Sequence, residues 1–269
     1  MKRESFVCRY GGWAVITGAS DGIGQAFVRE LASLGMNVVL VARRGDRLDH
    51  LAGEIAQKHQ VETRVIAADL STAAGRNSVD EGTRGLDVGM LVASAGFGTS
   101  GPLLSANLDS ELNMLDVNCR AVLEQSIVFG RRFAERRRGG IILMGSLLGW
   151  QGVPGAVHYA ATKAYVQSLA EGLGRELVSS NVDVLACAPG PVNSGFADRA
   201  DMRMGMAETP TSVARASLQA LGRRATVIPG RLGKFLTYSL LPLPRFLRIR
   251  ILAGVMGSMT RHQSAYSPL

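Results

Sequence analysis

Short apolar runs alternate along the chain with longer segments of helical period, and this alternation restricts the fold more than any other feature. Strand-length apolar runs without a clean two-residue alternation occur at 13–17, 36–42, 63–68, 88–93, 140–144, 182–187 and 225–228. Runs of this kind are typical of parallel strands buried on both faces. Between them, helices are predicted near 22–34, 46–58, 105–132, 158–178 and 211–221, with Ser71 capping one more. Right-handed crossovers then predict an α/β fold: a doubly wound parallel sheet of about seven strands with helices on both faces.

Composition narrows the class of protein. The chain has 269 residues and is 46% hydrophobic, which suits one large α/β domain and excludes global disorder. No internal repeat or linker divides the first 230 residues, and no Cys/His cluster has metal-ligand spacing, so no metal site is expected. The sparse cysteines Cys8, Cys119 and Cys187 favour a reducing, cytoplasmic location. Residues 1–12 lack the apolar stretch of a secretory signal.

The formal net charge of +8 is unevenly distributed. Every Asp and Glu lies between Glu4 and Glu208, so residues 1–208 are nearly neutral at −1 and the last 61 residues carry +9. The nine basic residues of that terminal part are Arg215, Arg223, Arg224, Arg231, Lys234, Arg245, Arg248, Arg250 and Arg261. A basic segment suits nucleic acid, an anionic membrane or an anionic substrate.

A glycine-rich turn, Thr17–Gly24, joins the first predicted strand to the first predicted helix. Gly18, Gly22 and Gly24 allow a tight turn and close approach of the backbone to a pyrophosphate, which the free N–H groups of the helix N-terminus attract. The strand–turn–helix context favours a dinucleotide site over an ordinary glycine turn.

Arg43 and Arg44 follow the second predicted strand, where a dinucleotide fold places its ribose-reading residue. An acidic residue there would favour NAD, whereas forked guanidinium donors suit a 2′-phosphate. We therefore expect NADP(H), with the alternative that Arg44 or Arg47 merely solvates the start of a helix.

Tyr159 and Lys163 stand at i and i+4 on one predicted helix face, and Ser146 follows the fifth strand, at the sheet edge where ligands bind. A tyrosine with a pKa near 10 is a poor acid–base group at neutral pH. A nearby ammonium and a positively charged nicotinamide would lower that pKa. Singly, each of these residues has an ordinary structural explanation, but their order after the glycine turn favours a catalytic site.

The motifs in series resemble the short-chain dehydrogenase/reductase family, in its single-domain branch. The resemblance runs from about residue 12 to 228 and includes Asp69-Leu70, Asn118, Ser146 thirteen residues before Tyr159, and the segment Pro189–Ser194. It implies a Rossmann-type NADP-binding catalytic domain over residues 1–229, and a homodimer or homotetramer formed through the two long helices.

The resemblance also implies residue roles. Tyr159 would transfer a proton to or from the substrate oxygen, Ser146 would orient that oxygen, Lys163 would lower the Tyr159 pKa and bind the nicotinamide ribose, and Asn118 would position a water. Asp69 would bind the adenine, and Val192 and Ser194 the nicotinamide amide. The implied cofactor-binding set is Gly18, Ser20, Asp21, Gly22, Ile23, Gly24, Arg43, Arg44, Asp69, Leu70, Ala95, Gly96, Tyr159, Lys163, Pro189, Gly190, Val192 and Ser194.

Two positions depart from the family pattern. Ala93-Ser94-Ala95-Gly96 stands where the family has Asn-Asn-Ala-Gly, which we expect to loosen strand contacts near the adenine ribose. Ser194 replaces the family's Thr but keeps the hydroxyl. Neither departure indicates an inactive enzyme.

The substrate signals indicate an apolar carbonyl compound. Asp21 and the run 36–44 resemble reductases of long-chain 3-oxoacyl thioesters and steroid dehydrogenases. The loop 196–210 is expected to cover the substrate, with Met202, Met204 and Met206 offering an adaptable apolar surface, although they can equally be loop residues without that role.

Residues 230–269 form a basic amphipathic extension beyond the family's usual end. Its apolar stretches 233–241 and 245–252 are too short to span a bilayer, and the second interleaves arginines with apolar residues. The extension is expected to be a lid over a lipid-like substrate, a peripheral membrane contact, or a helical pair packed on the domain or at a subunit interface. Nucleic acid is disfavoured because stacking aromatics are few.

The sequence therefore predicts an NADP(H)-dependent oxidoreductase that interconverts a lipophilic ketone and a secondary alcohol. The alternative is a dinucleotide-binding regulatory or scaffold protein that kept the fold, against which the intact Ser146, Tyr159 and Lys163 speak.

Overall fold

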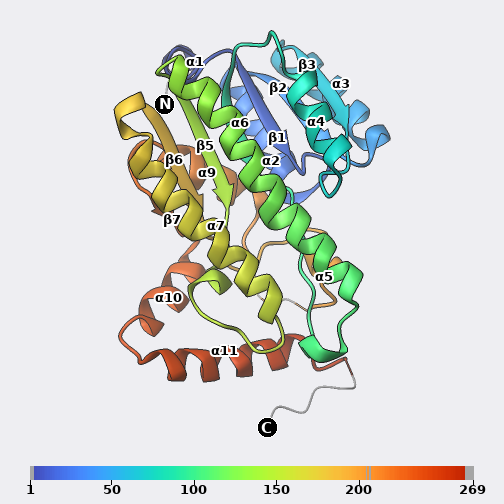
Figure 1. The fold of residues 1–269 in the computed structure, drawn as a ribbon, viewed down its shortest axis with the longest axis vertical. Helices are drawn as coiled ribbons and strands as arrows, with labels where there is room; N and C mark the ends of the chain where they lie inside the picture. Colours follow the sequence, from blue (N-terminus) through green and yellow to red (C-terminus); the bar gives the residue numbers. More distant parts are fainter. Residues whose placement is uncertain (1–2, 204, 206, 264–269) are drawn as a thin grey trace.

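The computed structural model describes residues 3–203, 205 and 207–263. Its centre is a fully parallel sheet of seven strands in the order β3-β2-β1-β4-β5-β6-β7 (Figure 1). The strands are β1 (Trp13–Thr17), β2 (Asn37–Ala42), β3 (Thr63–Ala67), β4 (Val88–Ala93), β5 (Gly139–Met144), β6 (Val182–Cys187) and β7 (Thr226–Val227). The predicted fold class is confirmed, and the order reverses direction at β1 and β4, where open sheets of this kind bind ligands.

Helices cover both faces of the sheet. The first face carries α1 (Arg3–Tyr10), α2 (Gly22–Ser33), α3 (Gly45–His59) and α9 (Pro210–Ala220). The second carries α4 (Ala73–Gly82), α6 (Ala121–Glu135) and α7 (Val157–Glu176), with α5 (Leu108–Leu115) preceding α6. Successive residues of a strand pack on opposite faces of the sheet: Ile16 lies in the apolar core of the first face and Val15 in that of the second. This double covering explains why the strands are apolar throughout.

The remaining helices lie away from the sheet. α8 (Phe196–Arg199) is a single turn after β6, and α10 (Arg231–Leu240) and α11 (Arg245–Met259) form the end of the molecule opposite the N-terminus (Figure 1). Short 3-10 turns occur at Leu103–Ser105, Leu147–Trp150 and Val178–Ser180. No helix in the described part of the chain is long and apolar enough to cross a membrane.

The predicted helix at 105–132 is confirmed as one continuous helical run, but it begins later than expected and contains a π turn. α5 begins only after Asn107, whose side chain accepts a hydrogen bond from the Ser110 N–H and caps the helix. A π turn, Asp116–Arg120, then continues α5 into α6 without a break in the helix. Such turns insert one residue into a helix and often mark functional sites. The apolar spacing of the sequence did not register this insertion.

Two local details also differ from expectation. Thr72, not Ser71, caps α4, because its Oγ1 accepts from the Gly75 N–H, while Ser71 donates to the Asp69 carboxylate. Helix α1 was not predicted, because it has only eight residues and half of them are polar. Phe6 and Tyr10 are buried in the core, and the Tyr10 hydroxyl donates to Asp183 of β6 at 2.8 Å. Tertiary burial therefore holds a helix that is too short to be stable alone.

Candidate active site

Two adjoining cavities open beyond the carboxyl ends of the strands. One, the glycine-turn cavity, has a volume of about 580 Å³ and is lined by the turn after β1 and the ends of β2, β3 and β4. The other, the tyrosine cavity, has about 520 Å³ and is lined by the ends of β5 and β6 with α7, α10 and α11. Both are lined by Ile23, Ser94, Gly96, Ser194 and Phe196, so the two cavities meet.

The glycine turn is tightly folded. Gly18 and Gly22 have φ of +68° and +52°, where a side chain would be strained. A Cβ on Gly24 would lie 2.2 Å from the Gly18 carbonyl oxygen, so only glycine fits. Asp21 caps α2 by accepting from the Gly22 N–H at 2.6 Å, and one N–H of the helix start is thereby already occupied. The remaining N–H groups and the wall of glycines leave room for a pyrophosphate.

The far end of the glycine-turn cavity carries charged groups from β2 and β3. Arg43 and Arg44 are exposed and line the cavity, and Arg44 donates to the Ser20 hydroxyl at 3.2 Å. Partial burial raises the pKa of Asp69, but hydrogen bonds from Ser71 and the charges of Arg43 and Arg199 outweigh it and leave that pKa below its ordinary value. Leu70 completes this wall.

Arg199, which the sequence did not single out, lines the same cavity from α8. Its guanidinium carbon lies 3.5 Å from the centre of the Phe97 ring, a cation–π contact. Desolvation and the charge of Arg43 lower the pKa of Arg199, whereas Asp69 raises it. A single arginine in a one-turn helix has no spacing that could have revealed it, because only the fold brings the end of β2 and α8 together.

Ser94 still connects two strand ends despite its departure from the family pattern. The Ser94 hydroxyl donates to the Thr17 carbonyl oxygen, and the Ala95 N–H donates to the Thr17 hydroxyl at 3.1 Å. The shorter side chain therefore still joins the end of β4 to the end of β1. Ala95 and Gly96 follow in the wall of the glycine-turn cavity.

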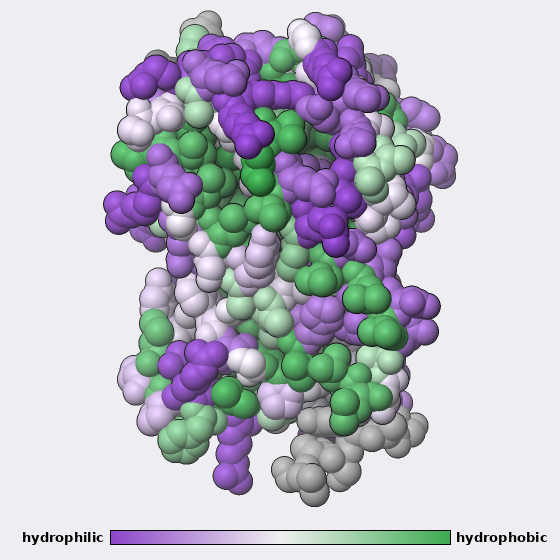
Figure 2. Space-filling model, in the orientation of Figure 1, coloured by the Kyte–Doolittle hydropathy of each residue, from purple (hydrophilic) through white to green (hydrophobic). Residues whose placement is uncertain are grey.

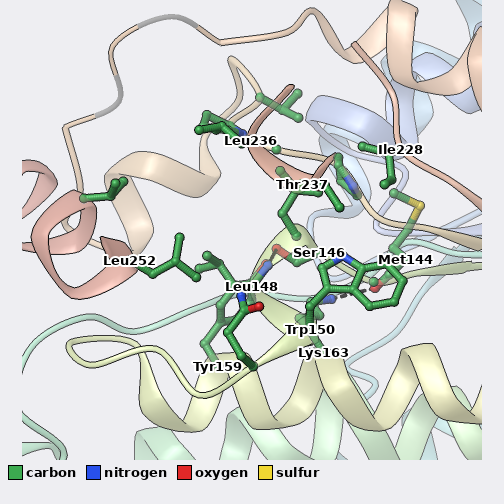
Figure 3. Close-up of a pocket in the computed structure, with 18 of the residues that line it drawn as sticks. Met144, Ser146, Leu148, Trp150, Tyr159, Lys163, Ile228, Leu236, Thr237 and Leu252 are labelled. Carbon is green, nitrogen blue, oxygen red and sulfur yellow. Dashed lines mark hydrogen bonds between the residues drawn. The ribbon is translucent and has the colours of Figure 1, made fainter. Parts of the chain in front are cut away.

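Tyr159, Lys163 and Ser146 come together in the tyrosine cavity. Tyr159 and Lys163 rise from α7 toward Ser146 at the end of β5 (Figure 3). The Lys163 Nζ lies 5.7 Å from the centre of the Tyr159 ring and donates to the Met144 carbonyl oxygen at 2.8 Å. All three residues are buried. A phenol, a hydroxyl and an ammonium at the mouth of an apolar cavity can bind and protonate a carbonyl oxygen.

Burial dominates the acid–base properties of this cluster. It raises the pKa of Tyr159 to about 12, against a smaller lowering by the Ser146 side chain. It also lowers the pKa of Lys163 to about 8. The expected lowering of the Tyr159 pKa by Lys163 is not found in the chain by itself, where desolvation dominates and the ammonium binds a backbone carbonyl.

Asn118 lies in the π turn, fully buried, and lines neither cavity. Its amide accepts from the Phe97 N–H at 3.1 Å and donates to the Phe97 carbonyl at 2.9 Å and to the Thr162 hydroxyl at 3.1 Å. A Cβ on Gly96 would approach both the Asn118 amide oxygen and the Lys163 Nζ. Asn118 thus holds the loop after β4 against α7, and its amide nitrogen has no donor left for the expected water.

The segment after β6 lies between the two cavities. Pro189, Gly190 and Val192 line the tyrosine cavity, and Ser194 lines both. The Pro189 carbonyl accepts from the Leu147 N–H at 3.1 Å, which fixes the segment beside the turn that carries Ser146. The structure thus places every residue of the predicted cofactor-binding set in the wall of one of the two cavities.

The C-terminal extension covers the tyrosine cavity. Leu252 and Met256 of α11 pack against Val153, Ala156 and Met202 in a small apolar cluster. Residues of α10, including Leu236 and Thr237, line the opposite wall (Figure 3). Among the expected loop methionines, Met202 is buried here, and Met204 and Met206 lie outside the described residues. Across the described ranges no cluster of potential metal ligands occurs.

A family model described as short chain dehydrogenase matches residues 12–204, which include the glycine turn, Ser146, Tyr159 and Lys163. The chain belongs to the short-chain dehydrogenase family. It is therefore an oxidoreductase of alcohols and ketones, and its family binds NAD(P). The fold, the order of the motifs and the meeting of the two cavities agree with this membership.

Curated relatives of this short-chain dehydrogenase include hydroxysteroid dehydrogenases and very-long-chain 3-oxoacyl-CoA reductases. The chain is 33% identical over 230 residues to the 7beta-hydroxysteroid dehydrogenase of Clostridium sardiniense, covering 84% of this chain and 88% of the relative. It is 31% identical over 239 residues to the very-long-chain 3-oxoacyl-CoA reductase-B of Danio rerio, covering 86% and 76%.

Solved structures show the same architecture. A 7beta-hydroxysteroid dehydrogenase superposes with a TM-score of 0.85 at 29% identity, covering 91% of this chain and 98% of the other. A short-chain dehydrogenase from Sphingobium yanoikuyae in complex with NADPH gives a TM-score of 0.76 at 27% identity, covering 95% and 96%.

Proposed function

We propose that this short-chain dehydrogenase is an NADP(H)-dependent oxidoreductase that interconverts a lipophilic ketone and a secondary alcohol, with Tyr159 as the acid–base group. The observation that carries the proposal is the meeting of Ser146, Tyr159 and Lys163 at one wall of an apolar cavity. This cavity adjoins the one formed by the glycine turn. A purely regulatory or scaffold role would require neither the buried lysine nor the apolar cavity.

The glycine-turn cavity fits a dinucleotide with a 2′-phosphate. Arg43, Arg44 and Arg199 gather at its far end, and the two positions directly after β2 hold arginines where an acidic residue would bind a ribose 2′-hydroxyl. Arg43 and Arg199 have no hydrogen bond or ion pair with a described side chain, so their donors are free for an anion. When bound, the nicotinamide cofactor would supply or accept the hydride.

The residues of the tyrosine cavity would bind and protonate the oxygen of the substrate. The Ser146 hydroxyl would donate to the carbonyl oxygen and hold it beside the Tyr159 hydroxyl. Because burial holds the pKa of Tyr159 near 12, the phenol remains protonated at neutral pH and can donate its proton during reduction. The Lys163 ammonium then stabilises the negative charge that develops on the phenol oxygen.

The acid–base role is tested by Tyr159→Phe, which keeps the ring and its contact with Phe196 at 5.3 Å. Removal of the proton donor is expected to lower kcat by roughly a thousandfold or more, because general acid catalysis contributes about 10²–10⁴. NADPH binding, followed by cofactor fluorescence, is expected to survive. A variant that keeps its turnover would exclude Tyr159 as the acid–base group.

An apolar, bulky substrate suits the composition of the tyrosine cavity. Its wall is dominated by aliphatic and aromatic side chains, among them Leu148, Trp150, Leu236 and Leu252 (Figure 3). About 520 Å³ is within the range of pockets that hold drug-sized ligands. NADPH oxidation should be screened with steroid ketones, 3-oxoacyl thioesters and small ketones. Faster turnover of small ketones than of both bulky classes would contradict this assignment.

Location and assembly form part of the same proposal. The three cysteines are free thiols, which suits a cytoplasmic enzyme. Exposed Leu112, Ile127 and Tyr165 on α5, α6 and α7 offer a face for a homodimer or homotetramer. Sedimentation velocity measures the assembly, and a monomer at all concentrations would contradict it.

The outer surface of α10 and α11 suits contact with an anionic membrane. Phe235 and Phe246 are 69% and 68% exposed, and Arg250 is exposed nearby in sequence. On the face seen in Figure 2, hydrophobic and hydrophilic residues are mixed at this end of the molecule. No acidic residue follows Glu208, so self-association through this surface would oppose like charges, whereas anionic lipid would neutralise them.

This membrane contact is tested by sedimentation with phosphatidylcholine vesicles, with and without about one third phosphatidylglycerol. Binding only to the anionic vesicles, weakened by salt, is expected. The double variant Phe235→Ser/Phe246→Ser should lose it, and Val178→Ser, an exposed apolar residue elsewhere, should not. Absence of salt-sensitive vesicle binding would exclude the contact.

A further inference from the structure

Cations are present in the wall of the tyrosine cavity without a counter-charge. Arg224, Lys234 and Arg248 line it, and no Asp or Glu does among the residues that the structure describes. Catalysis of a carbonyl reduction by Tyr159 requires none of these cations. A charge in an apolar wall is costly unless a partner compensates it, so the cavity as it stands lacks an anion.

Arg248 is the cation for which this imbalance is greatest. Arg224 and Lys234 are exposed, so water can solvate their charged ends. The Arg248 Nε, in contrast, is buried and has no hydrogen-bond partner. Arg248 also forms no ion pair with any described residue. Because a guanidinium does not lose its proton in proteins, Arg248 stays charged, with one donor covered and unsatisfied.

A second buried donor lines the same cavity. The Trp150 Nε1 has no acceptor, although it too is shielded from solvent. Buried polar groups in native proteins almost always have partners, so unpaired donors at a ligand cavity indicate that the ligand supplies acceptors. Trp150 lies near Ser146, and Leu252, one turn beyond Arg248 on α11, lies on the other side of the cavity (Figure 3). The cavity thus offers hydrogen-bond donors besides those of the catalytic cluster.

We infer that the substrate of this site is an amphipathic oxo acid, with a carboxylate that binds Arg248 while its carbonyl lies at Tyr159 and Ser146. The Nε and one Nη of an arginine form a side-on fork that matches the two oxygens of a carboxylate. The free Nε of Arg248 is one arm of that fork. The position of the carbonyl rests on the proposed function, but the carboxylate site does not.

The pairing of Arg248 with a carboxylate would make the site selective for acidic substrates. A site built around a buried charged donor binds a ligand that lacks the matching acceptor much more weakly, because the donor then remains desolvated and unpaired. Neutral ketones of the same apolar shape would therefore be poorer substrates than the corresponding oxo acids. The apolar wall would still bind the hydrocarbon part of both.

The experiment measures binding without cofactor or turnover. Trp150 lines the cavity and Trp13 lies in β1, so tryptophan fluorescence can follow a ligand that enters. Dodecanoate and its methyl ester serve as probes, since they share the chain and differ in charge. Wild-type protein is expected to bind dodecanoate roughly ten- to hundredfold more tightly than the ester, the range of a charge-assisted hydrogen bond.

Variants on α11 assign that preference to one side chain. Arg248→Met should weaken dodecanoate by the same factor and leave the ester unchanged. Arg245→Met, one turn earlier, exposed and outside the cavity wall, should behave as wild type. An unaltered thermal midpoint of Arg248→Met would exclude misfolding as the cause of its loss.

Several results would overturn the inference: equal binding of acid and ester by the wild type, equal weakening of both by Arg248→Met, or the same loss in Arg245→Met. A failure of the proposed function is distinguishable, because it would appear as absent NADPH oxidation while the carboxylate preference persisted. Conversely, an active reductase without carboxylate preference would support the proposed function and overturn the carboxylate site.

Discussion

Lys163 is expected to destabilise the cofactor-free protein, and replacement by methionine should reveal it. The ammonium of this α7 residue is buried and has one hydrogen bond, to the Met144 carbonyl at 2.8 Å. Desolvation lowers its pKa from the ordinary 10.5 to about 8. A base whose pKa is lower in the folded protein than in the unfolded protein opposes folding while it is charged. The free energy of unfolding therefore rises with pH between the folded and the unfolded pKa, and this gain is lost as pH falls through the folded pKa.

The magnitude follows from that lowering of the pKa. From 10.5 to about 8, it corresponds to about 3 kcal/mol of penalty on the charged form. Near pH 7 nearly all of this penalty applies, whereas at about pH 9.5 only about 1 kcal/mol remains. Lys163→Met removes the penalty but leaves the Met144 carbonyl unpaired, which costs about 1–3 kcal/mol. The free energy of unfolding of Lys163→Met, relative to wild type, should therefore be about 2 kcal/mol lower at about pH 9.5 than near pH 7.

Urea denaturation of wild type and Lys163→Met at both pH values measures this difference. Because the lost hydrogen bond is common to both conditions, the comparison isolates the titration of the lysine. Lys58→Met, at an exposed position of α3, is the matched control and should show no such pH dependence. An identical effect of Lys163→Met at both pH values would refute the assignment of a buried, charged lysine.

Further substitutions test the cofactor site and the lid. Arg43→Ala is expected to weaken NADPH about tenfold or more and NADH little, measured by cofactor fluorescence, while Arg47→Ala, outside the cavity, should change neither. Equal losses for both cofactors would contradict the NADP(H) assignment. Gly24→Ala places a Cβ 2.2 Å from a backbone oxygen and should abolish cofactor binding and lower the melting temperature, whereas Gly53→Ala, with open space around it, should raise that temperature. Met256→Ala should increase KM for a bulky ketone more than for a small one, because it removes buried apolar surface from the tyrosine cavity. The opposite order of effects would exclude a substrate-covering role for α11.

Much of the site could be predicted because its residues follow strand ends. Parallel strands place their carboxyl ends at one edge of the sheet, so Gly18, Arg43, Asp69, Gly96 and Ser146 meet there whatever the details of the helices. The i, i+4 spacing placed Tyr159 and Lys163 on one helix face. Local spacing and topology were sufficient for these positions.

Other properties of the site depend on contacts between distant segments. Arg199 reaches the cavity near Arg43 because α8 folds over Phe97. The fully engaged amide of Asn118 depends on the π turn, which apolar spacing does not register. The raised pKa of Tyr159 is a consequence of burial, which no sequence pattern measures.

The charge distribution shows the same division. The sequence by itself determined that residues after Glu208 are basic and amphipathic, because composition and order are properties of the chain alone. It left a lid, a membrane contact and a packed helical pair open. Only the tertiary structure decided that α10 and α11 lie over the tyrosine cavity, with Leu252 and Met256 inside and Phe246 outside. The physical reason is that such a helix has more than one face that could be buried. Which face is buried depends on the apolar surface that the rest of the chain presents.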